Sequence, residues 1–174
     1  MTNFEEGEII LIDKPYRWTS FDVVNKIRYA LRSFTGKKKN KIGHAGTLDP
    51  LASGLLILLT GKMTKNIETF QEFEKEYTGT FSLGATTPCF DLEKGIDARY
   101  ATDHITEELI RKTAEKFTGN ILQKPPVYSA IKINGKRAYQ YARKEQDVEI
   151  PAKAVMIRKF EITRIALPEV DFRV

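Results

Sequence analysis

The sequence predicts an α+β fold, in which helices pack on a mixed β-sheet. Strand patterns occur at several places in the chain, but they neither alternate strictly with helices nor recur at the regular spacing of an all-β protein. The length of 174 residues is that of one domain with a single hydrophobic core. We therefore expect one domain over residues 1–174.

The first half of the chain predicts two strands and two helices. Residues 8–15, EIILIDKP, form a buried strand that Pro15 closes. Residues 19–34 form a helix that Thr19 or Ser20 can cap, with Asp22 in its first turn. Its predicted apolar face consists of Val23, Ile27, Ala30, Leu31 and Phe34. After a loop over 35–50, we expect a strand at 54–60, GLLILLT, and a short helix at 65–73.

The second half predicts three further strand regions and one clear helix. KEYTGTFSLG, 75–84, alternates like a strand, and 85–103 has no period and is expected to be a long loop. TEELIRKTAEKFTG, 106–119, is a helix with Thr106 as N-cap and Gly119 at its end. Residues 125–143 predict a hairpin around Asn134-Gly135 that runs into a helix, and 153–167 predict one long, bulged strand.

Positive charge is concentrated in one segment. The formal net charge is +5, and no acidic residue lies between Asp22 and Asp49. That interval holds Lys26, Arg28, Arg32, Lys37, Lys38, Lys39 and Lys41. A basic island of this kind is typical of a protein that binds a phosphate backbone, although a solvated basic loop would look the same.

Several classes of protein and site fit the sequence poorly. A single cysteine, Cys89, excludes an intrachain disulfide and a multi-cysteine metal cluster, and His44 and His104 lack ligand spacing, so we expect no metal. The glycines of GLLILLTGKMT enclose six residues rather than the four of a phosphate loop. The longest apolar run, LLILL, is too short for a membrane span, and the acidic N-terminus does not resemble a signal peptide. We therefore expect a cytoplasmic protein.

The segment IGHAGTLDPLASG carries the candidate chemistry. Gly43 and Gly46 allow close backbone approaches, and Pro50 restricts the conformation of Asp49, which gives its carboxylate a restrained direction. The alternative is that Asp49 caps a short helical turn through Leu51–Ser53, and spacing alone favours the cap; both roles are compatible. Tyr77 is either a core tyrosine or an aromatic platform for a base taken out of its stack.

Four motifs, in order, resemble the tRNA pseudouridine synthase B family over nearly all of residues 7–174. They are LIDKP with WTSFDVV, then IGHAGTLDPLASGLLILLTGKMTK, then KEYTGTFSLGATT with the following FD, then PPVYSAIKINGKRAYQYAR. The resemblance implies a pseudouridine-synthase-like fold, with a largely antiparallel central sheet flanked by helices. It also implies isomerisation of a T-loop uridine in tRNA to pseudouridine, by base flipping and without a metal or an organic cofactor. We expect a monomer whose partner is the T-arm of tRNA.

The resemblance also implies a role for individual residues. Asp49 would be the catalytic carboxylate that acts on the flipped nucleotide, and Tyr77 would stack on the extruded uracil. His44 would contact the RNA loop or fill the space that the base leaves, while Lys14 with Pro15 would support the pocket. Asp91 would be the acidic residue after the tyrosine strand, completing the substrate-binding set. Phosphates would be contacted by Arg28, Arg32, Lys37, Lys38, Lys39 and Lys41.

Some positions depart from the family pattern. Arg17 stands where many members have glycine, and Pro88 and Cys89 interrupt the usual threonine-aspartate-threonine pattern. The family's catalytic arginine, in a Gly-Thr-Tyr-Ile-Arg motif, and its C-terminal RNA-binding domain would lie beyond Val174. We therefore expect a truncated catalytic domain that binds tRNA weakly and isomerises it little or not at all.

Two other functions remain as alternatives. A non-catalytic RNA-binding module could use the same basic face. A hydrolase could use Asp49 as its nucleophile, but a glycosidase would need a second carboxylate nearby, and the sequence offers no clear partner.

Overall fold

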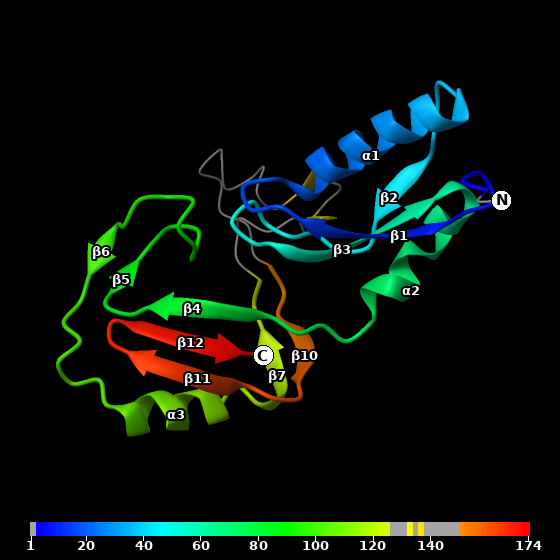
Figure 1. The fold of residues 1–174 in the computed structure, drawn as a ribbon. Helices are drawn as coiled ribbons and strands as arrows, with labels where there is room; N and C mark the ends of the chain where they lie inside the picture. Colours follow the sequence, from blue (N-terminus) through cyan, green and yellow to red (C-terminus); the bar gives the residue numbers. More distant parts are fainter. Residues whose placement is uncertain (1–2, 126–131, 134–135, 138–149) are drawn as a thin grey trace. The chain divides into compact units, whose positions relative to one another are not determined.

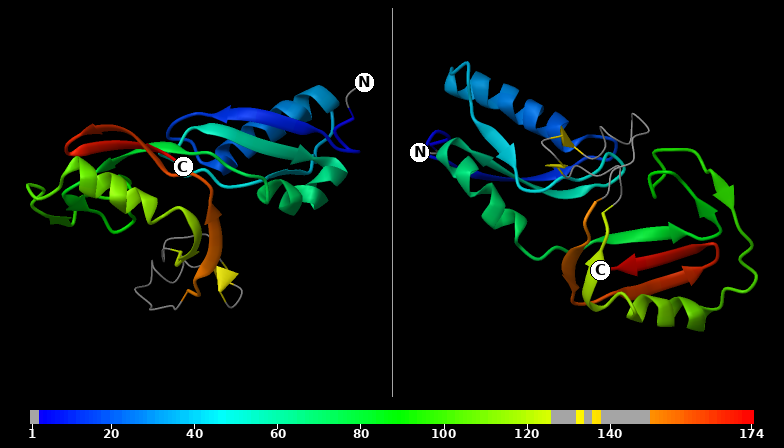
Figure 2. Two further views of the ribbon diagram at one scale, coloured as in Figure 1. Left: turned by 90° about the horizontal axis from the view of Figure 1, so that it is seen from below. Right: turned by 180° about the vertical axis from the view of Figure 1, so that it is seen from behind.

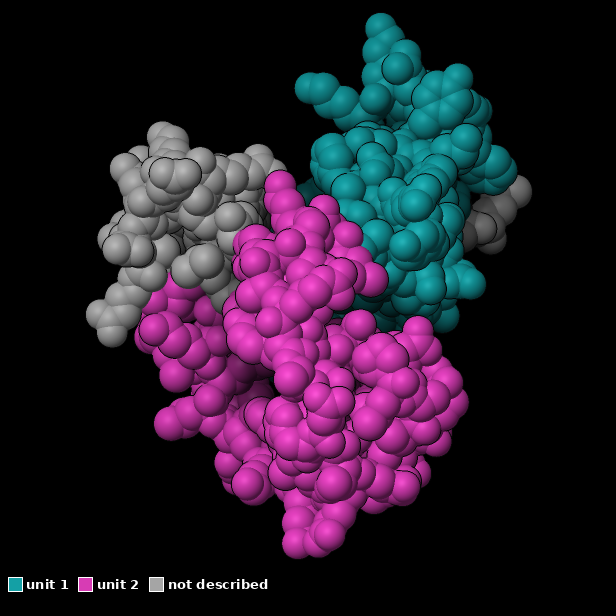
Figure 3. Space-filling view, turned by 90° about the vertical axis from the view of Figure 1, so that its left-hand side faces the viewer, with its two compact units in different colours: residues 1–75 teal, residues 76–174 magenta. Residues whose placement is uncertain are grey.

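The computed structural model describes residues 3–125, 132–133, 136–137 and 150–174. The chain divides into two compact units, Met1–Lys75 and Glu76–Val174, which are coloured separately in Figure 3. Every strand pair in the described residues is antiparallel, and helices accompany the sheets in both units (Figure 1). The predicted α+β fold with antiparallel sheets is therefore confirmed. The extent of a single domain stays a prediction.

Unit 1 is built on a three-stranded sheet with the order β1-β3-β2. Its strands are β1 (Ile9–Lys14), β3 (Gly54–Thr60) and β2 (Ile42–His44). The aliphatic run LLILL lies in β3, the central strand, where both edges are hydrogen-bonded. Buried central strands of this kind favour branched aliphatic residues, as the sequence pattern predicted.

Helix α1 (Ser20–Thr35) covers one face of this sheet (Figure 2). Thr19 is its N-cap and Gly36 ends it in the left-handed conformation. The predicted apolar face is confirmed at Val23, Ile27 and Leu31, which are covered. The prediction is wrong at Ala30 and Phe34, which are exposed. Val24 is buried instead, so the packed stripe lies further round the helix. The core comprises Val23, Val24, Leu56 and Leu58, with Ile10, Ile12, Ile27 and Ile42 packed against it.

After β3 the chain forms the 3₁₀-helix η1 (Gly61–Asn66) and the short helix α2 (Ile67–Gln71). Gly61 has a φ of 52°, and a Cβ there would overlap the Glu5 carbonyl oxygen. This glycine therefore allows the N-terminal segment to cross close to the end of β3. The close crossing explains the glycine without a phosphate loop.

Unit 2 contains a three-stranded sheet, β11-β12-β4, and a separate pair, β10-β7. The strands are β4 (Thr78–Ser82), β7 (Gly119–Gln123), β10 (Lys153–Ile157), β11 (Glu161–Ala166) and β12 (Glu169–Arg173). The prediction of one strand over 153–167 is wrong. The chain leaves one sheet after Ile157 and enters the other at Glu161, at the point where its alternation slips.

The remaining elements of unit 2 are short. The predicted loop 85–103 contains one antiparallel pair, β5 (Ala85–Thr86) with β6 (Ala98–Arg99), so that prediction is wrong in part. Helix α3 (Glu107–Glu115) begins at the predicted cap Thr106. The predicted hairpin is confirmed by β8 (Lys132–Ile133) and β9 (Lys136–Arg137), while the helix expected at its end lies outside the described residues.

Helix α3 packs against β11 and leaves an apolar cavity of about 560 Å³ in unit 2. Leu109 and Phe117 line it from the helix side, and Phe81 and Val170 line it from the sheet. His104 lies in this apolar lining rather than among metal-ligating groups. Among the described residues, no helix is long and apolar enough to cross a membrane.

Candidate functional site

Asp49 lies in a tight turn between β2 and β3 and is exposed. The Ala52 amide donates a hydrogen bond to the Asp49 carbonyl oxygen at 3.0 Å, which closes the turn around Pro50 and Leu51. The turn does not continue into a helix, and in the described part of the chain the Asp49 carboxylate makes no capping hydrogen bond. The cap alternative therefore fails, and the carboxylate is available to an incoming molecule.

Arg17, before α1, and Ser20, its first residue, hold the backbone on both sides of Asp49. The Ser20 hydroxyl accepts a hydrogen bond from the Leu48 amide at 2.9 Å and donates one to the Leu48 carbonyl oxygen at 3.1 Å. The Arg17 amide donates to the Pro50 carbonyl oxygen at 2.7 Å. Neither contact could be found from the sequence, because both join residues about 30 positions apart. The TSFD motif indicated only a helix cap.

His44 is the last residue of β2 and lies opposite Leu58. Its Nδ1 contacts the Gly46 carbonyl oxygen. A carbonyl oxygen can only accept, so Nδ1 carries the proton in this contact, and Nε2 is left for another partner. The half-buried ring is thus held in a defined orientation within the Asp49 loop.

Lys14 has no exposed surface at all. Its ammonium group donates to the carbonyl oxygens of Pro15, at 3.1 Å, and Trp18, at 2.5 Å. A buried ammonium needs such acceptors, and these two fix the loop between β1 and α1. The buried Lys14 therefore supports this loop, and its place among the substrate-binding residues stays a prediction.

The same loop is fixed at its far end by a capping box. The Thr19 amide and hydroxyl both donate to the Asp22 carboxylate, and the Thr19 hydroxyl accepts from the Asp22 amide. The hydrogen bond from the Thr19 side chain, followed by that from its amide, holds the pKa of Asp22 below its ordinary value. Arg17 adopts a φ of 67°, a left-handed conformation in which glycine is favoured.

Tyr77 and Asp91 belong to unit 2. Tyr77 extends β4, since its backbone exchanges two hydrogen bonds with Val174, and its side chain is 49% exposed. That exposure excludes a core tyrosine and leaves the ring available for stacking. The Asp91 carboxylate accepts from the Glu93 amide and the Cys89 thiol, so it also organises its own loop.

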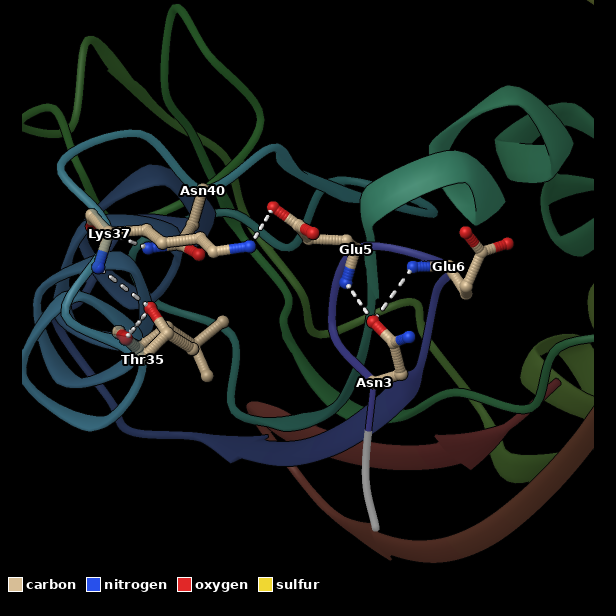
Figure 4. A network of polar contacts seen from close by, with 7 residues as sticks. Asn3, Glu5, Glu6, Thr35, Lys37 and Asn40 are labelled. Atoms are coloured by element: carbon tan, nitrogen blue, oxygen red, sulfur yellow. Dashed lines mark hydrogen bonds and ion pairs between the residues drawn. The ribbon is translucent and has the colours of Figure 1, made fainter.

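The basic residues are mostly exposed but not equally available. Lys37 is paired with Glu5, and the Glu5 and Glu6 amides donate to the Asn3 side chain beneath them (Figure 4). Arg28 donates to Asn25 and lies over the Phe21 ring. The exposed basic residues of the segment are Lys26, Arg32, Lys37, Lys38, Lys39 and Lys41.

No group of three or more potential metal ligands occurs among the residues that the structure describes. The exposed carboxylate in a braced turn can act as a nucleophile or a base. The basic segment 26–41 belongs to the same unit as this carboxylate. A polyanion is the ligand that this charge distribution favours.

Comparison with known proteins places these features in a family. A family described as TruB family pseudouridylate synthase, N-terminal domain, matches residues 26–174. A protein named tRNA pseudouridine synthase B from Phocaeicola vulgatus is 58% identical over 172 residues, which are 99% of this chain and 73% of that protein. The protein of the same name from Flavobacterium johnsoniae is 57% identical over 170 residues, 97% of this chain and 74% of that protein.

Two solved structures share the fold. One chain of a Cbf5-Nop10-Gar1 complex matches 98% of this chain with a TM-score of 0.65 and 25% identity. A chain of an H/ACA RNP bound to a substrate RNA containing 2'-deoxyuridine matches with a TM-score of 0.60 and 22% identity. This chain spans 39% and 37% of the lengths of those chains.

Proposed function

The chain belongs to the TruB family of pseudouridylate synthases, and from this premise we propose that it acts on a T-loop uridine of tRNA, with Asp49 as its catalytic residue. The observation that carries the proposal is the exposed carboxylate of Asp49 in a turn whose backbone is held on both sides. Further support comes from the name tRNA pseudouridine synthase B, which relatives more than 50% identical carry.

The reaction is an isomerisation, so every atom of the nucleotide is retained except exchangeable protons. The bond between the sugar C1′ and N1 of uracil breaks, and a bond between C1′ and C5 forms after the base has turned. C5 loses its hydrogen as a proton, and N1 gains one. Asp49 either attacks the flipped nucleotide covalently or assists cleavage of the glycosidic bond, which divides one difficult step into two.

The other residues prepare the nucleotide. A base stacked inside RNA must leave the stack before its C1′ can be reached, and an aromatic ring such as Tyr77 compensates for the lost stacking. His44 contacts the RNA loop, and Lys14 supports the turn that carries Asp49. Asp91 fixes the loop after the tyrosine strand.

We further propose that the basic segment binds the phosphates of the T-arm and that the protein acts as a monomer. The phosphate contacts are best tested at Lys38 and Lys39, because Lys37 already has Glu5 as a partner. When the logarithm of the RNA-binding constant is plotted against the logarithm of the salt concentration, changing both lysines to alanine reduces the magnitude of the slope by about 1.5 to 2. The matched pair Lys112→Ala and Lys159→Ala, from unit 2, leaves that slope unchanged.

The catalytic proposal is tested by tritium release from T-loop RNA labelled at C5 of uridine. Protein is in excess over RNA, so that even one slow turnover is measured. Asp49→Asn abolishes release while the Kd for RNA changes less than twofold. Asp13→Asn, a change at an exposed aspartate of the same unit, leaves release intact.

The same assay decides between the alternatives. Slow release that Asp49→Asn removes supports the isomerase, whereas RNA binding with release at background in both forms means that this chain acts as a binding module. Rapid multiple turnover contradicts the expectation that these 174 residues isomerise tRNA little or not at all.

A further inference from the structure

Ser20 has a contact that its position in the helix does not require. It is the first residue of α1, but Thr19 already caps that helix. Only 3% of Ser20 is exposed, and its hydroxyl bonds both the amide and the carbonyl group of Leu48. A buried hydroxyl that both donates to and accepts from one residue fixes that residue's peptide groups in two directions.

Leu48 is the residue directly before Asp49. On the other side of Asp49, the Pro50 carbonyl oxygen accepts from the Arg17 amide at 2.7 Å. Three hydrogen bonds from residues 17–20 therefore bracket a single exposed carboxylate. The bond from the Ala52 amide to the Asp49 carbonyl oxygen completes the restraint of the turn.

The bracketing segment is itself rigid. The Lys14 ammonium group holds the carbonyl groups of Pro15 and Trp18, and the capping box joins Thr19 to Asp22. Restraint therefore passes to the backbone of Asp49 from α1, which contributes Val23 and Val24 to the core of unit 1, and from β1, which packs against that core.

We propose that Ser20 is a positioning residue for Asp49: its hydroxyl clamps Leu48 and so fixes the direction from which the carboxylate meets the nucleotide. The inference rests on the proposed function of Asp49. Among the hydrogen bonds of the described residues, only the two that the Ser20 hydroxyl makes hold the backbone on the Leu48 side of Asp49. A displacement of about 1 Å at a reacting group can cost about a hundredfold in rate.

The experiment compares Ser20→Ala with Ser33→Ala, the same change in the same helix but at an exposed serine that bonds only its own helix. Ser20→Thr keeps the hydroxyl and serves as the conservative variant. Three quantities are measured in the 174-residue chain: hydrogen exchange of the Leu48 amide, the single-turnover rate of tritium release, and the Kd for T-loop RNA.

Ser20→Ala should raise exchange at the Leu48 amide at least tenfold and lower the single-turnover rate 10- to 100-fold, with the Kd within twofold. The Ala45 amide, which bonds the Ile57 carbonyl oxygen, should exchange as in the wild type. Ser20→Thr should recover most of the rate, and Ser33→Ala should match the wild type in all three quantities.

Unchanged exchange at Leu48 in Ser20→Ala overturns the clamp. Faster exchange with an unchanged rate overturns positioning and leaves a structural hydrogen bond. If Ser20→Ala does not fold, Ser20→Cys, which is slightly larger and is a weaker donor and acceptor, takes its place in every comparison. Absence of turnover in the wild type means that this chain does not catalyse the proposed reaction by itself and overturns positioning in it, whereas exchange at the Leu48 amide still decides whether Ser20 holds the turn.

Discussion

Gly61 offers a direct test of the close crossing between the N-terminal segment and the end of β3. Its backbone has a φ of 52°, and Gly36 at the end of α1 has a φ of 70°. Both are left-handed, so alanine meets a similar conformational cost at each. The two sites differ in their surroundings: a Cβ at Gly36 meets nothing within 4 Å, whereas a Cβ at Gly61 overlaps the carbonyl oxygen of Glu5.

The expected losses follow from this difference. The left-handed conformation costs alanine about 1 to 2 kcal/mol, and the smaller freedom of the unfolded chain returns about 0.4 to 1 kcal/mol. Gly36→Ala should therefore lower the free energy of unfolding by about 0 to 1.6 kcal/mol. Gly61→Ala adds an overlap that moves the backbone, at about 1 to 3 kcal/mol, and endangers the hydrogen bond from the Lys62 amide to Glu5, at about 1 kcal/mol. Its loss should be at least about 2 kcal/mol.

Urea unfolding followed by tryptophan fluorescence measures both variants. Trp18 is the one tryptophan in the chain and lies in unit 1, as do both glycines. Equal losses in the two variants would refute the steric explanation, because the shared conformational cost would then account for both.

Three further predictions concern unit 1. Arg17→Gly should raise the free energy of unfolding by about 0.5 to 1 kcal/mol, because the relief of a left-handed arginine outweighs the added freedom of the unfolded chain. Urea unfolding measures this change, and Arg17→Ala, which keeps a Cβ, should show no gain. The lowered pKa of Asp22 means that its contribution to stability is present at neutral pH and is lost as the pH falls below about 4. The stability difference between wild type and Asp22→Asn should therefore shrink on acidification, and a difference that is the same at pH 6 and pH 3 contradicts this. Leu58 has no exposed surface, so Leu58→Ala should lower the free energy of unfolding by about 2 to 5 kcal/mol. Leu55 lies in the same strand but is 63% exposed, so Leu55→Ala should lower it by less than about 1 kcal/mol. Similar losses of stability in urea unfolding would contradict the assignment of Leu58 to the core.

Local patterns predicted the elements that local interactions determine. The helix at α1 was predicted from a cap, an acidic first turn and an apolar stripe, and all three signals act within a few residues of each other. The exposed Phe34 shows the limit, because whether a helix residue is covered depends on what the rest of the chain brings to it. The strand predicted over 153–167 failed for the same reason: which sheet a strand joins depends on its partners, β7 for β10 and β12 for β11.

The candidate site likewise combines residues that the sequence identified with contacts that only the structure shows. Asp49, with its glycines and proline, was identified from a motif, and in the structure Asp49 is exposed in a turn; its catalytic role stays a prediction. The alternative of a helix cap could not be rejected from spacing, since cap and turn begin with the same residues. The hydroxyl of Ser20 carries no signal of its own in the sequence, because the residue that it contacts is 28 positions away.

The buried amine of Lys14 has a practical consequence. Reagents that acylate lysines reach the exposed side chains of Lys38 and Lys39 at once, but they reach Lys14 only when the loop between β1 and α1 opens. Mass spectrometry of the peptide that contains Lys14, sampled over time, therefore records how often this loop opens in the native protein. The rate at which Lys14 is acylated therefore reports the opening of the loop that holds the proposed catalytic turn.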